Sequence, residues 1–203
     1  MQTVEFLFDF GSPNAYLSHK LVPEIEARTG AKFVYTPVLL GGLFKLTGNQ
    51  APMLAFGNIP NKLRYESLEM QRFIRRHGLT QFRMNPHFPV NTLQIMRGAV
   101  AAQVAGLFES YVDHVCADMW ERGRKMDDPA VIRASLEEAS LPADELIALS
   151  QSDEVKATLL ANTQKAAERG AFGIPTFFVG EEIFFGKDRL RDVEDELARQ
   201  AES

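Results

Sequence analysis

Alternating and continuous apolar runs at the start of the chain predict two short β-strands. Residues 4–10 (VEFLFDF) and residues 32–40 (KFVYTPVLL) are rich in β-branched and aromatic residues. Between them, apolar residues at helical spacing over residues 13–28 predict a helix, which Pro23 must kink or break. A strand, a helix and a strand of these lengths form a βαβ unit, so we expect the two strands to be parallel.

The middle of the chain has a different pattern. Residues 41–61 are rich in Gly, Pro and Asn, which indicates a long irregular connection of the kind that is often functional. From residue 62 to about residue 162 the apolar spacing is helical almost throughout. The expected helices are 62–77, 91–105, 107–123, 128–138, 142–149 and 152–169.

Strand character returns only near the end of the chain. Residues 174–180 (IPTFFVG) and the following EEIFFG predict a hairpin that turns at residues 180–182. An amphipathic helix is expected after it. Because strands occur at both ends and helices between them, the pattern predicts an α/β protein. It has one small mixed sheet built from both ends and a helical domain inserted between them.

Composition and charge narrow the class of protein. The 203 residues are 45% hydrophobic and 24% charged, with a formal net charge of −5 and no long basic run. This argues against a nucleic-acid or membrane-surface partner. The N-terminus lacks the features of a signal peptide, and no apolar run is long enough to span a membrane. We therefore expect a soluble, cytoplasmic protein.

The single cysteine, Cys116, excludes an intramolecular disulfide and a cysteine-rich zinc site. Its flanking sequence VDHVCADMW is typical of an amphipathic helix, so a buried or half-buried thiol is expected. A lone cysteine is consistent with a reducing compartment. No pair of the four histidines has metal-ligand spacing with a carboxylate partner.

Two short segments carry a resemblance to the thioredoxin fold. DFGSPNA places a serine where the first helix begins, and GIPTFFV opens the third strand with a proline. The helical block between them resembles the DsbA-like group. The resemblance implies a thioredoxin-like domain over residues 1–45 and 163–203, with an inserted helical domain over 46–162. Redox members of that group carry Cys-x-x-Cys where this chain has residues 12–15, SPNA, so dithiol exchange is excluded.

Further segments resemble a narrower family, the 2-hydroxychromene-2-carboxylate isomerases and the related kappa-class glutathione transferases. They are FDFGSPNAY, GN at 48–49, NK at 61–62, FPVNTLQIMRG and GIPTFFV followed by FFGKDRL. The resemblance covers residues 4 to about 197. It implies a cytoplasmic homodimer of aromatic catabolism that uses glutathione to interconvert 2-hydroxychromene-2-carboxylate and trans-o-hydroxybenzylidenepyruvate.

Ser12 is the residue on which that chemistry depends. A thiol with a pKa near 8.5 is only a few per cent ionised at neutral pH. A hydroxyl donor at the positive end of a helix favours the thiolate. Ser12 would then be a hydrogen-bond donor to the sulfur of glutathione rather than a nucleophile. The alternative is that Ser12 only caps the helix, with Pro13 at its first position.

The resemblance also implies a set of glutathione-binding residues, and each has an ordinary structural alternative. Pro175 should be cis, which leaves the backbone of Ile174 to pair with the cysteinyl unit. Asp188 and Lys187 would receive the γ-glutamyl ammonium and carboxylate. Asn49 and Lys62 would meet the glycyl end and backbone. The alternatives are a helix-capping or first-turn acid for Asp188, a turn residue for Asn49 and a solvated lysine for Lys62.

The sequence identifies the residues that would bind the substrate less specifically than those that would bind glutathione. The resemblance implies a small aromatic or unsaturated keto acid, held in an apolar slot with a few polar groups. The candidate pocket residues are Phe10, Tyr65, Phe88 and Asn91. Most phenylalanines of the chain are expected in the core, and Asn91 is equally suited to cap a helix.

Two other functions remain open at this point. The same thiolate would serve a glutathione transferase that conjugates electrophiles and releases the adduct. The scaffold would also serve a binding module of the DsbA type without cysteines, which predicts no ordered glutathione site.

Overall fold

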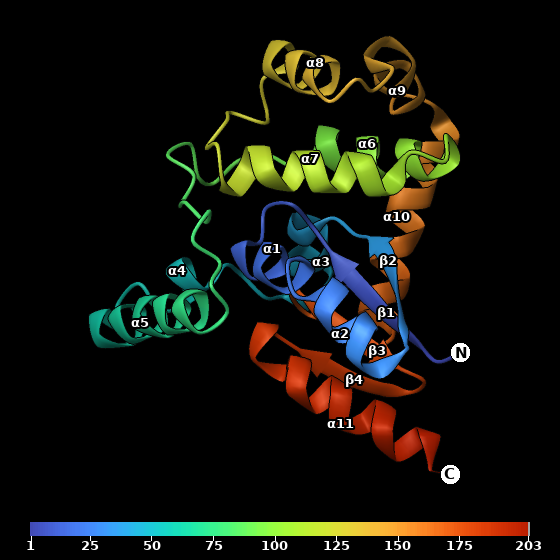
Figure 1. The fold of residues 1–203 in the computed structure, drawn as a ribbon. Coiled ribbons are helices and arrows are strands. Elements are labelled where there is room, and N and C mark those ends of the chain that lie inside the picture. The colour runs from blue at the N-terminus through green and yellow to red at the C-terminus, as the bar shows by residue number, and fades with distance from the viewer. Residues whose placement is uncertain (203) are drawn as a thin grey trace.

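A four-stranded mixed sheet forms the centre of the computed structural model, which describes residues 1–202 (Figure 1). Its strands, in the order β2-β1-β3-β4 across the sheet, are β1 (Thr3–Phe8), β2 (Lys32–Pro37), β3 (Thr176–Val179) and β4 (Glu182–Phe185). β1 is parallel to β2 and antiparallel to β3, and β3 is antiparallel to β4. The expected parallel pair, the hairpin and the sheet built from both ends of the chain are confirmed.

Phe6 marks the middle of this sheet. It pairs with Tyr35 of β2 and with Phe177 of β3. Its ring centroid lies 4.7 Å from that of Tyr35 and 4.9 Å from that of Phe177. Such aromatic pairs between neighbouring strands stabilise a sheet beyond the area they bury. The N-terminal and C-terminal parts of the chain are thus joined through one buried aromatic cluster.

The helix predicted after β1 is broken in two. α1 (Pro13–His19) and α2 (Val22–Thr29) are separate helices, and Gly30 ends α2 with a positive φ of 73°. Pro23 lies in the first turn of α2, where the N–H that proline lacks has no intrahelical partner in any case. The predicted break at Pro23 is confirmed, just ahead of that residue.

The prediction of an irregular connection over residues 41–61 is wrong in part. α3 (Leu40–Thr47) and α4 (Pro52–Ala55) are helical. Gly42 faces α10 so closely that an added Cβ would lie 3.2 Å from Thr163 Cγ2. Leu43, next to it, is fully buried. Tertiary packing therefore outweighs the low helix propensity of the two glycines in α3.

The other helices agree with the sequence to within a few residues at most ends. They are α5 (Pro60–Arg76), α6 (Leu93–Val104), α7 (Phe108–Trp120), α8 (Pro129–Glu138), α9 (Ala143–Leu149), α10 (Asp153–Glu168), the 3₁₀ turn η1 (Lys187–Arg189) and α11 (Leu190–Ala201). α6 and α7 lie over one side of the sheet, α8 and α9 lie beyond them, and α4 and α5 extend to one side (Figure 1). The proposed domain boundaries at 45/46 and 162/163 fall inside α3 and α10.

The helical block and the sheet share a continuous core. The indole Nε1 of Trp120, a fully buried residue at the end of α7, donates to the carbonyl oxygen of Phe10 at 2.8 Å. Cys116, also on α7, is buried as expected, and burial raises the pKa of its thiol far above the usual range. In the part of the chain that the structure describes, none of the helices combines the length and apolar character that a membrane span requires.

Candidate active site

Ser12 lies between β1 and α1, at the N-cap position of α1. Its Oγ accepts a hydrogen bond from the backbone N–H of Ala15 at 3.2 Å. The same hydroxyl donates to the carbonyl oxygen of Ile174 at 3.0 Å. The capping role expected as the alternative is therefore present, and the hydroxyl also joins two segments that are 162 residues apart in the sequence. Ser12 is only 4% exposed.

The segment opposite Ser12 contains the cis peptide bond Ile174–Pro175, as the sequence predicts. The carbonyl oxygen of Pro175 accepts a hydrogen bond from the N–H of Gly186 at 2.9 Å. That bond holds the start of η1, with Lys187 and Asp188, beside the cis-proline segment. η1 in turn packs against α1. Four of the predicted glutathione-binding residues, together with Ser12, thus belong to one contiguous region.

Lys187 and Asp188 form an ion pair whose partners differ in exposure. The Nζ of Lys187 lies 2.9 and 2.8 Å from the two carboxylate oxygens of Asp188. The Lys187 side chain is 6% exposed and the Asp188 side chain 64%. The same Nζ lies 4.8 Å from the ring centroid of Phe73, a cation–π distance. Phe73 is the one residue of α5 that is buried, so this contact connects α5 to the region around Ser12.

Asn49 follows the end of α3, and Lys62 lies in the first turn of α5. The Nδ2 of Asn49 donates to the carbonyl oxygen of Phe172 at 2.7 Å, two residues before Ile174. The Nζ of Lys62 lies 2.7 Å from a carboxylate oxygen of Glu66 and 4.3 Å from the ring centroid of Phe56. Asn49 therefore contacts the chain next to the cis-proline segment, whereas Lys62 is held on α5 by neighbours in sequence.

The four candidate substrate residues lie at three places. Phe10 is a core residue with 2% exposure, and the ring of Phe88 lies 6.0 Å from that of Trp120, the donor to the Phe10 carbonyl. Tyr65 lies on α5 with 58% exposure. The Oδ1 of Asn91 accepts from the N–H of Leu93, the first residue of α6, at 3.1 Å, while the N-cap residue of α6 is Thr92.

A buried carboxyl group three residues before Ser12 is not anticipated from the sequence pattern. Asp9 is fully buried. Its carboxylate oxygens accept from the N–H groups of Gly11 at 2.8 Å and Leu40 at 2.7 Å, and the Thr92 side chain hydrogen-bonds it as well. Burial raises the pKa of Asp9 above its usual range, and these three hydrogen bonds oppose that rise. The available signal was an acid inside the apolar run FLFDF.

The sequence pattern also does not indicate an exposed aromatic pair that lies next to the cis-proline segment. The rings of Phe172 and Phe185 lie 4.6 Å apart, and each residue is 43% exposed. They flank Gly173, where an added Cβ would lie only 2.7 Å from the Phe185 ring. A glycine is therefore required between the aromatic pair and Ile174.

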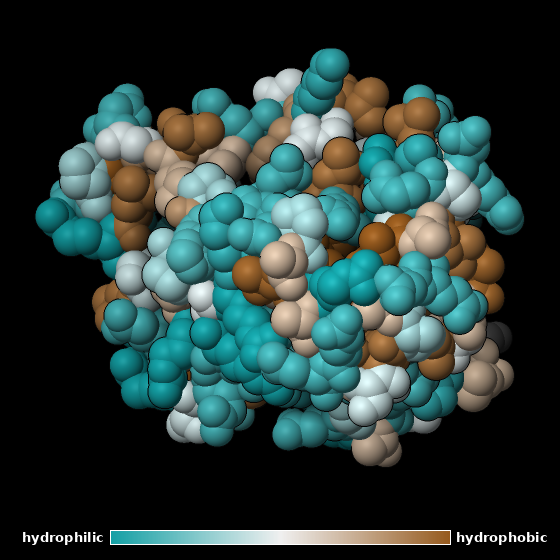
Figure 2. Space-filling model, turned by 90° about the horizontal axis from the view of Figure 1, so that it is seen from above, coloured by the Kyte–Doolittle hydropathy of each residue, from teal (hydrophilic) through white to brown (hydrophobic). Residues whose placement is uncertain are grey.

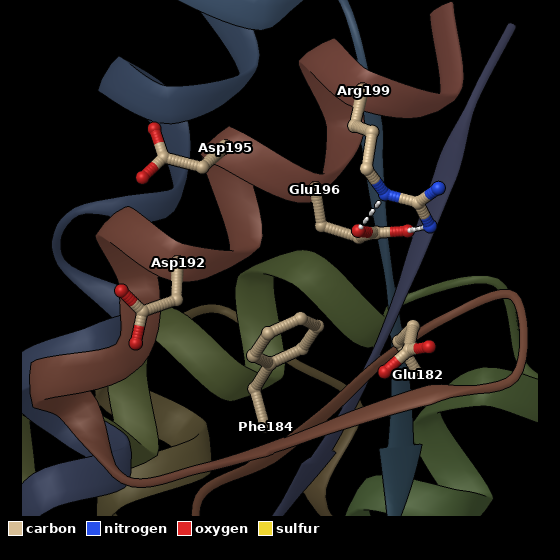
Figure 3. A pocket seen from close by; sticks show the side chains of 6 residues that line it. All are labelled: Glu182, Phe184, Asp192, Asp195, Glu196 and Arg199. Carbon is tan, nitrogen blue, oxygen red and sulfur yellow. Dashed lines mark hydrogen bonds and ion pairs between the residues drawn. The ribbon is translucent and has the colours of Figure 1, made fainter. Parts of the chain in front are cut away.

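A hollow of about 620 Å³ lies between β4 and α11, and its lining is more acidic than the region around Ser12 (Figure 3). Four acidic residues, Phe184 and Arg199 line it, and Arg199 is bonded to Glu196 at 2.7 and 2.6 Å. The acids are Glu182, Asp192, Asp195 and Glu196. Such a lining repels carboxylates, so it does not suit glutathione or a keto acid.

Comparison with known proteins agrees with the fold. Residues 3–198 match the model of the DSBA-like thioredoxin domain. A 2-hydroxychromene-2-carboxylate isomerase from Sphingobium xenophagum is 26% identical over 97% of this chain and 98% of its own length. Glutathione S-transferase kappa 1 from Homo sapiens is 25% identical over 93% of this chain and 88% of its own. A solved 2-hydroxychromene-2-carboxylate isomerase superimposes with a TM-score of 0.83 at 24% identity, covering 98% of this chain and 96% of its own.

Proposed function

This chain belongs to the DSBA-like thioredoxin domain family, and from that premise we propose that it is a glutathione-dependent isomerase. The proposed reaction interconverts 2-hydroxychromene-2-carboxylate and trans-o-hydroxybenzylidenepyruvate. The relatives that carry the isomerase name support it at 26% identity over nearly the whole chain. The single observation that carries it is the 3.0 Å contact between the Ser12 hydroxyl and the Ile174 carbonyl, beside a cis proline.

That contact suggests how glutathione is received. In the proposed complex, the cysteinyl N–H of glutathione donates to the carbonyl oxygen of Ile174 and takes the place of the Ser12 hydroxyl. The released hydroxyl then donates to the sulfur. Because both Ser12 and Ile174 are nearly buried, a neighbouring segment has to move before the sulfur can reach this position. α5, with Phe73 as its one buried residue, is the segment we propose for that movement.

The other predicted residues suit the remaining parts of the tripeptide. The γ-glutamyl group carries one ammonium and one carboxylate, and the neighbouring pair of Asp188 and Lys187 offers the opposite charges. The Nζ of Lys62 would meet the glycyl carboxylate. Asn49, bonded to the chain at Phe172, would contact the glycyl end through its remaining amide hydrogen.

The hemiketal ring first opens: the bond between the hemiketal carbon and the ring oxygen breaks, the hemiketal hydroxyl becomes the ketone, and its proton is transferred to the phenolic oxygen. The open form has a cis double bond conjugated to the ketone, and the thiolate then adds to it reversibly. The sulfur electron pair forms a C–S bond to the double bond conjugated to the ketone, and the displaced π electrons go to the carbonyl oxygen. The former double bond is now single and rotates. Return of the electrons expels the thiolate, restores the double bond in the other geometry and regenerates glutathione. We propose Phe10, Tyr65, Phe88 and Asn91 as residues around the aromatic acid.

The experiment that tests this function follows the absorbance of 2-hydroxychromene-2-carboxylate with the purified protein, with and without glutathione. We expect conversion only when glutathione is present, with no net loss of glutathione over many turnovers. Equal rates without glutathione, or no conversion at any glutathione concentration, contradict the proposal. S-methylglutathione, which has no free thiol, is the matched control and should inhibit rather than support the reaction.

A transferase is the second candidate, and the kappa-class relatives favour it. It needs the same thiolate but releases a glutathione conjugate. Stoichiometric loss of glutathione with an aryl halide, in the absence of isomerisation, would identify this activity. A binding module without catalysis would show neither reaction.

We also propose that the protein is a cytoplasmic homodimer, with α3 to α5 in the interface. Large apolar residues on this segment are exposed: Leu46, Met53, Leu54, Ile59, Tyr65 and Leu68. On the side of the molecule where α4 and α5 lie, apolar residues are interspersed among polar ones (Figure 2). Sedimentation equilibrium should give twice the mass of one chain, and Leu54→Glu should shift it towards one chain. An unchanged mass for Leu54→Glu excludes this interface.

A further inference from the structure

Asp9 connects three separate segments through one carboxyl group. Its Oδ1 accepts from the N–H of Gly11, in the loop that leads to Ser12. Its Oδ2 accepts from the N–H of Leu40, the first residue of α3. Thr92, at the start of α6, hydrogen-bonds it through its side chain. The backbone carbonyl oxygen of Asp9 accepts from the N–H of Ser12 itself at 3.1 Å.

A carboxyl group is the side chain that suits this position. Two N–H donors converge on different oxygens, and an ionised carboxylate provides two acceptor oxygens and no donor. Asparagine has the same size but only one acceptor oxygen, and its amide group would face an N–H at 2.7 or 2.8 Å. Burying a charged group is costly, and the hydrogen bonds to Asp9 offset part of that cost.

Close packing keeps the loop in place around these hydrogen bonds. A Cβ at Gly11 would lie 3.2 Å from Cγ2 of Thr92 and 3.3 Å from Oδ1 of Asp9. Both are shorter than ordinary contacts, so the loop has little room to shift towards α6. The position of Ser12 therefore depends on Asp9 on one side and on Ile174 on the other.

From this geometry we propose that Asp9 is a positioning residue, which fixes the Ser12 hydroxyl for its hydrogen bond to the glutathione sulfur by joining the β1–α1 loop to α3 and α6. This rests on the proposed function of Ser12. Hydrogen bonds weaken steeply when their geometry departs from the ideal, so a looser loop reduces thiolate stabilisation. The peptide part of glutathione is assigned to Ile174, Lys187 and Asp188, none of which bonds to Asp9.

The test is the variant Asp9→Asn, with two measurements on folded protein. Thiolate absorbance at saturating glutathione should show that the pKa of the bound thiol moves towards that of free glutathione. The value of kcat should fall about tenfold or more, because even a small misplacement of a reacting group slows a reaction by that much. The Kd of S-methylglutathione should stay within about twofold of wild type, because its peptide contacts are intact.

Three further variants complete the design. Thr92→Val removes one donor to Asp9 and should move the pKa of the bound thiol in the same direction as Asp9→Asn does. Thr92→Ser retains the hydroxyl, so the thiol pKa should stay at the wild-type value. These two variants replace Asp9→Asn in the test if that variant fails to fold. Asp118→Asn alters another fully buried carboxylate, which Arg122 contacts at 2.6 Å, and should leave the thiol titration unchanged.

The outcomes separate this inference from the proposed function. A wild-type titration curve in both Asp9→Asn and Thr92→Val overturns the positioning role of Asp9. A loss of S-methylglutathione affinity as large as the loss of kcat also overturns it, since that points to general disruption. A wild-type protein that leaves the thiol pKa of glutathione unchanged instead overturns the role of Ser12 itself.

Discussion

Ser12→Ala is expected to raise the pKa of the bound glutathione thiol by about one to two units and to lower turnover at neutral pH about 10- to 100-fold. A hydrogen bond to a charged group contributes about 1.5–3 kcal/mol, and one pKa unit corresponds to about 1.4 kcal/mol. The hydroxyl that supplies the bond is already a donor, to the Ile174 carbonyl at 3.0 Å. Titration of thiolate absorbance at saturating glutathione measures the change directly.

The pH dependence of this variant has a definite sign. Only the thiolate reacts, so the rate rises with pH through the pKa of the bound thiol. If the thiol pKa is higher in Ser12→Ala, the variant is slowest relative to wild type at pH values below that pKa. The difference in rate between the two proteins shrinks as the pH approaches and passes the pKa of the variant. A deficit that is the same at every pH would mean that Ser12 does not act through thiol ionisation.

Ser12→Ala also removes the cap of α1, so stability has to be separated from chemistry. Losing a serine N-cap costs about 1 kcal/mol of folding free energy. Ser18→Ala is a matched control on the same helix, because the Ser18 hydroxyl is buried and donates to the Asn14 carbonyl at 2.9 Å. It should lower the melting temperature without changing the thiol titration.

Sequence reasoning identified the elements of the fold because their signals are local. The apolar runs at both ends of the chain gave strands that pair, and the turn at residues 180–182 gave the expected hairpin. The cis bond at Pro175 followed from the resemblance to the thioredoxin fold. The domain division remains a proposal, since residues 45/46 and 162/163 lie within helices rather than linkers.

What could not be predicted depends on contacts between distant segments. Gly41 and Gly42 indicate a loop by propensity, and the packing of α3 against distant residues, with Gly42 against Thr163 and Leu43 fully buried, explains their place in a helix. The partners of Asp9 are 31 and 83 residues away along the chain, at Leu40 and Thr92. Lys187 is nearly buried, and the ring of Phe73 on α5, 114 residues earlier in the chain, lies 4.8 Å from its Nζ. The sequence around Gly42, Asp9 or Lys187 does not indicate which distant residue each of them contacts.

The placement of Lys187 leads to the second large effect. Lys187→Met keeps an unbranched side chain against the Phe73 ring but removes the ammonium that would pair with the γ-glutamyl carboxylate. We expect the Kd of glutathione to rise about 10- to 100-fold, which corresponds to the loss of one charge-assisted hydrogen bond. Isothermal titration calorimetry measures it. Asp188, with its side chain 64% exposed, can be solvated when its partner is lost, so the fold should be retained.

A truncated ligand distinguishes this effect from a general loss of binding. N-acetylcysteinylglycine lacks the γ-glutamyl group, so wild type should bind it more weakly than glutathione. Lys187→Met should show a smaller preference for glutathione than wild type, because only the pairing of Asp188 with the γ-glutamyl ammonium is left. Arg189→Met changes a neighbouring cation whose side chain is 58% exposed and paired with Asp192, and it should leave both affinities unchanged. Ser12→Ala and Lys187→Met should then affect different quantities, the thiol pKa in one and peptide affinity in the other. If Lys187→Met retains full preference for glutathione, η1 is not the γ-glutamyl site, and that group must bind elsewhere around the cis-proline segment.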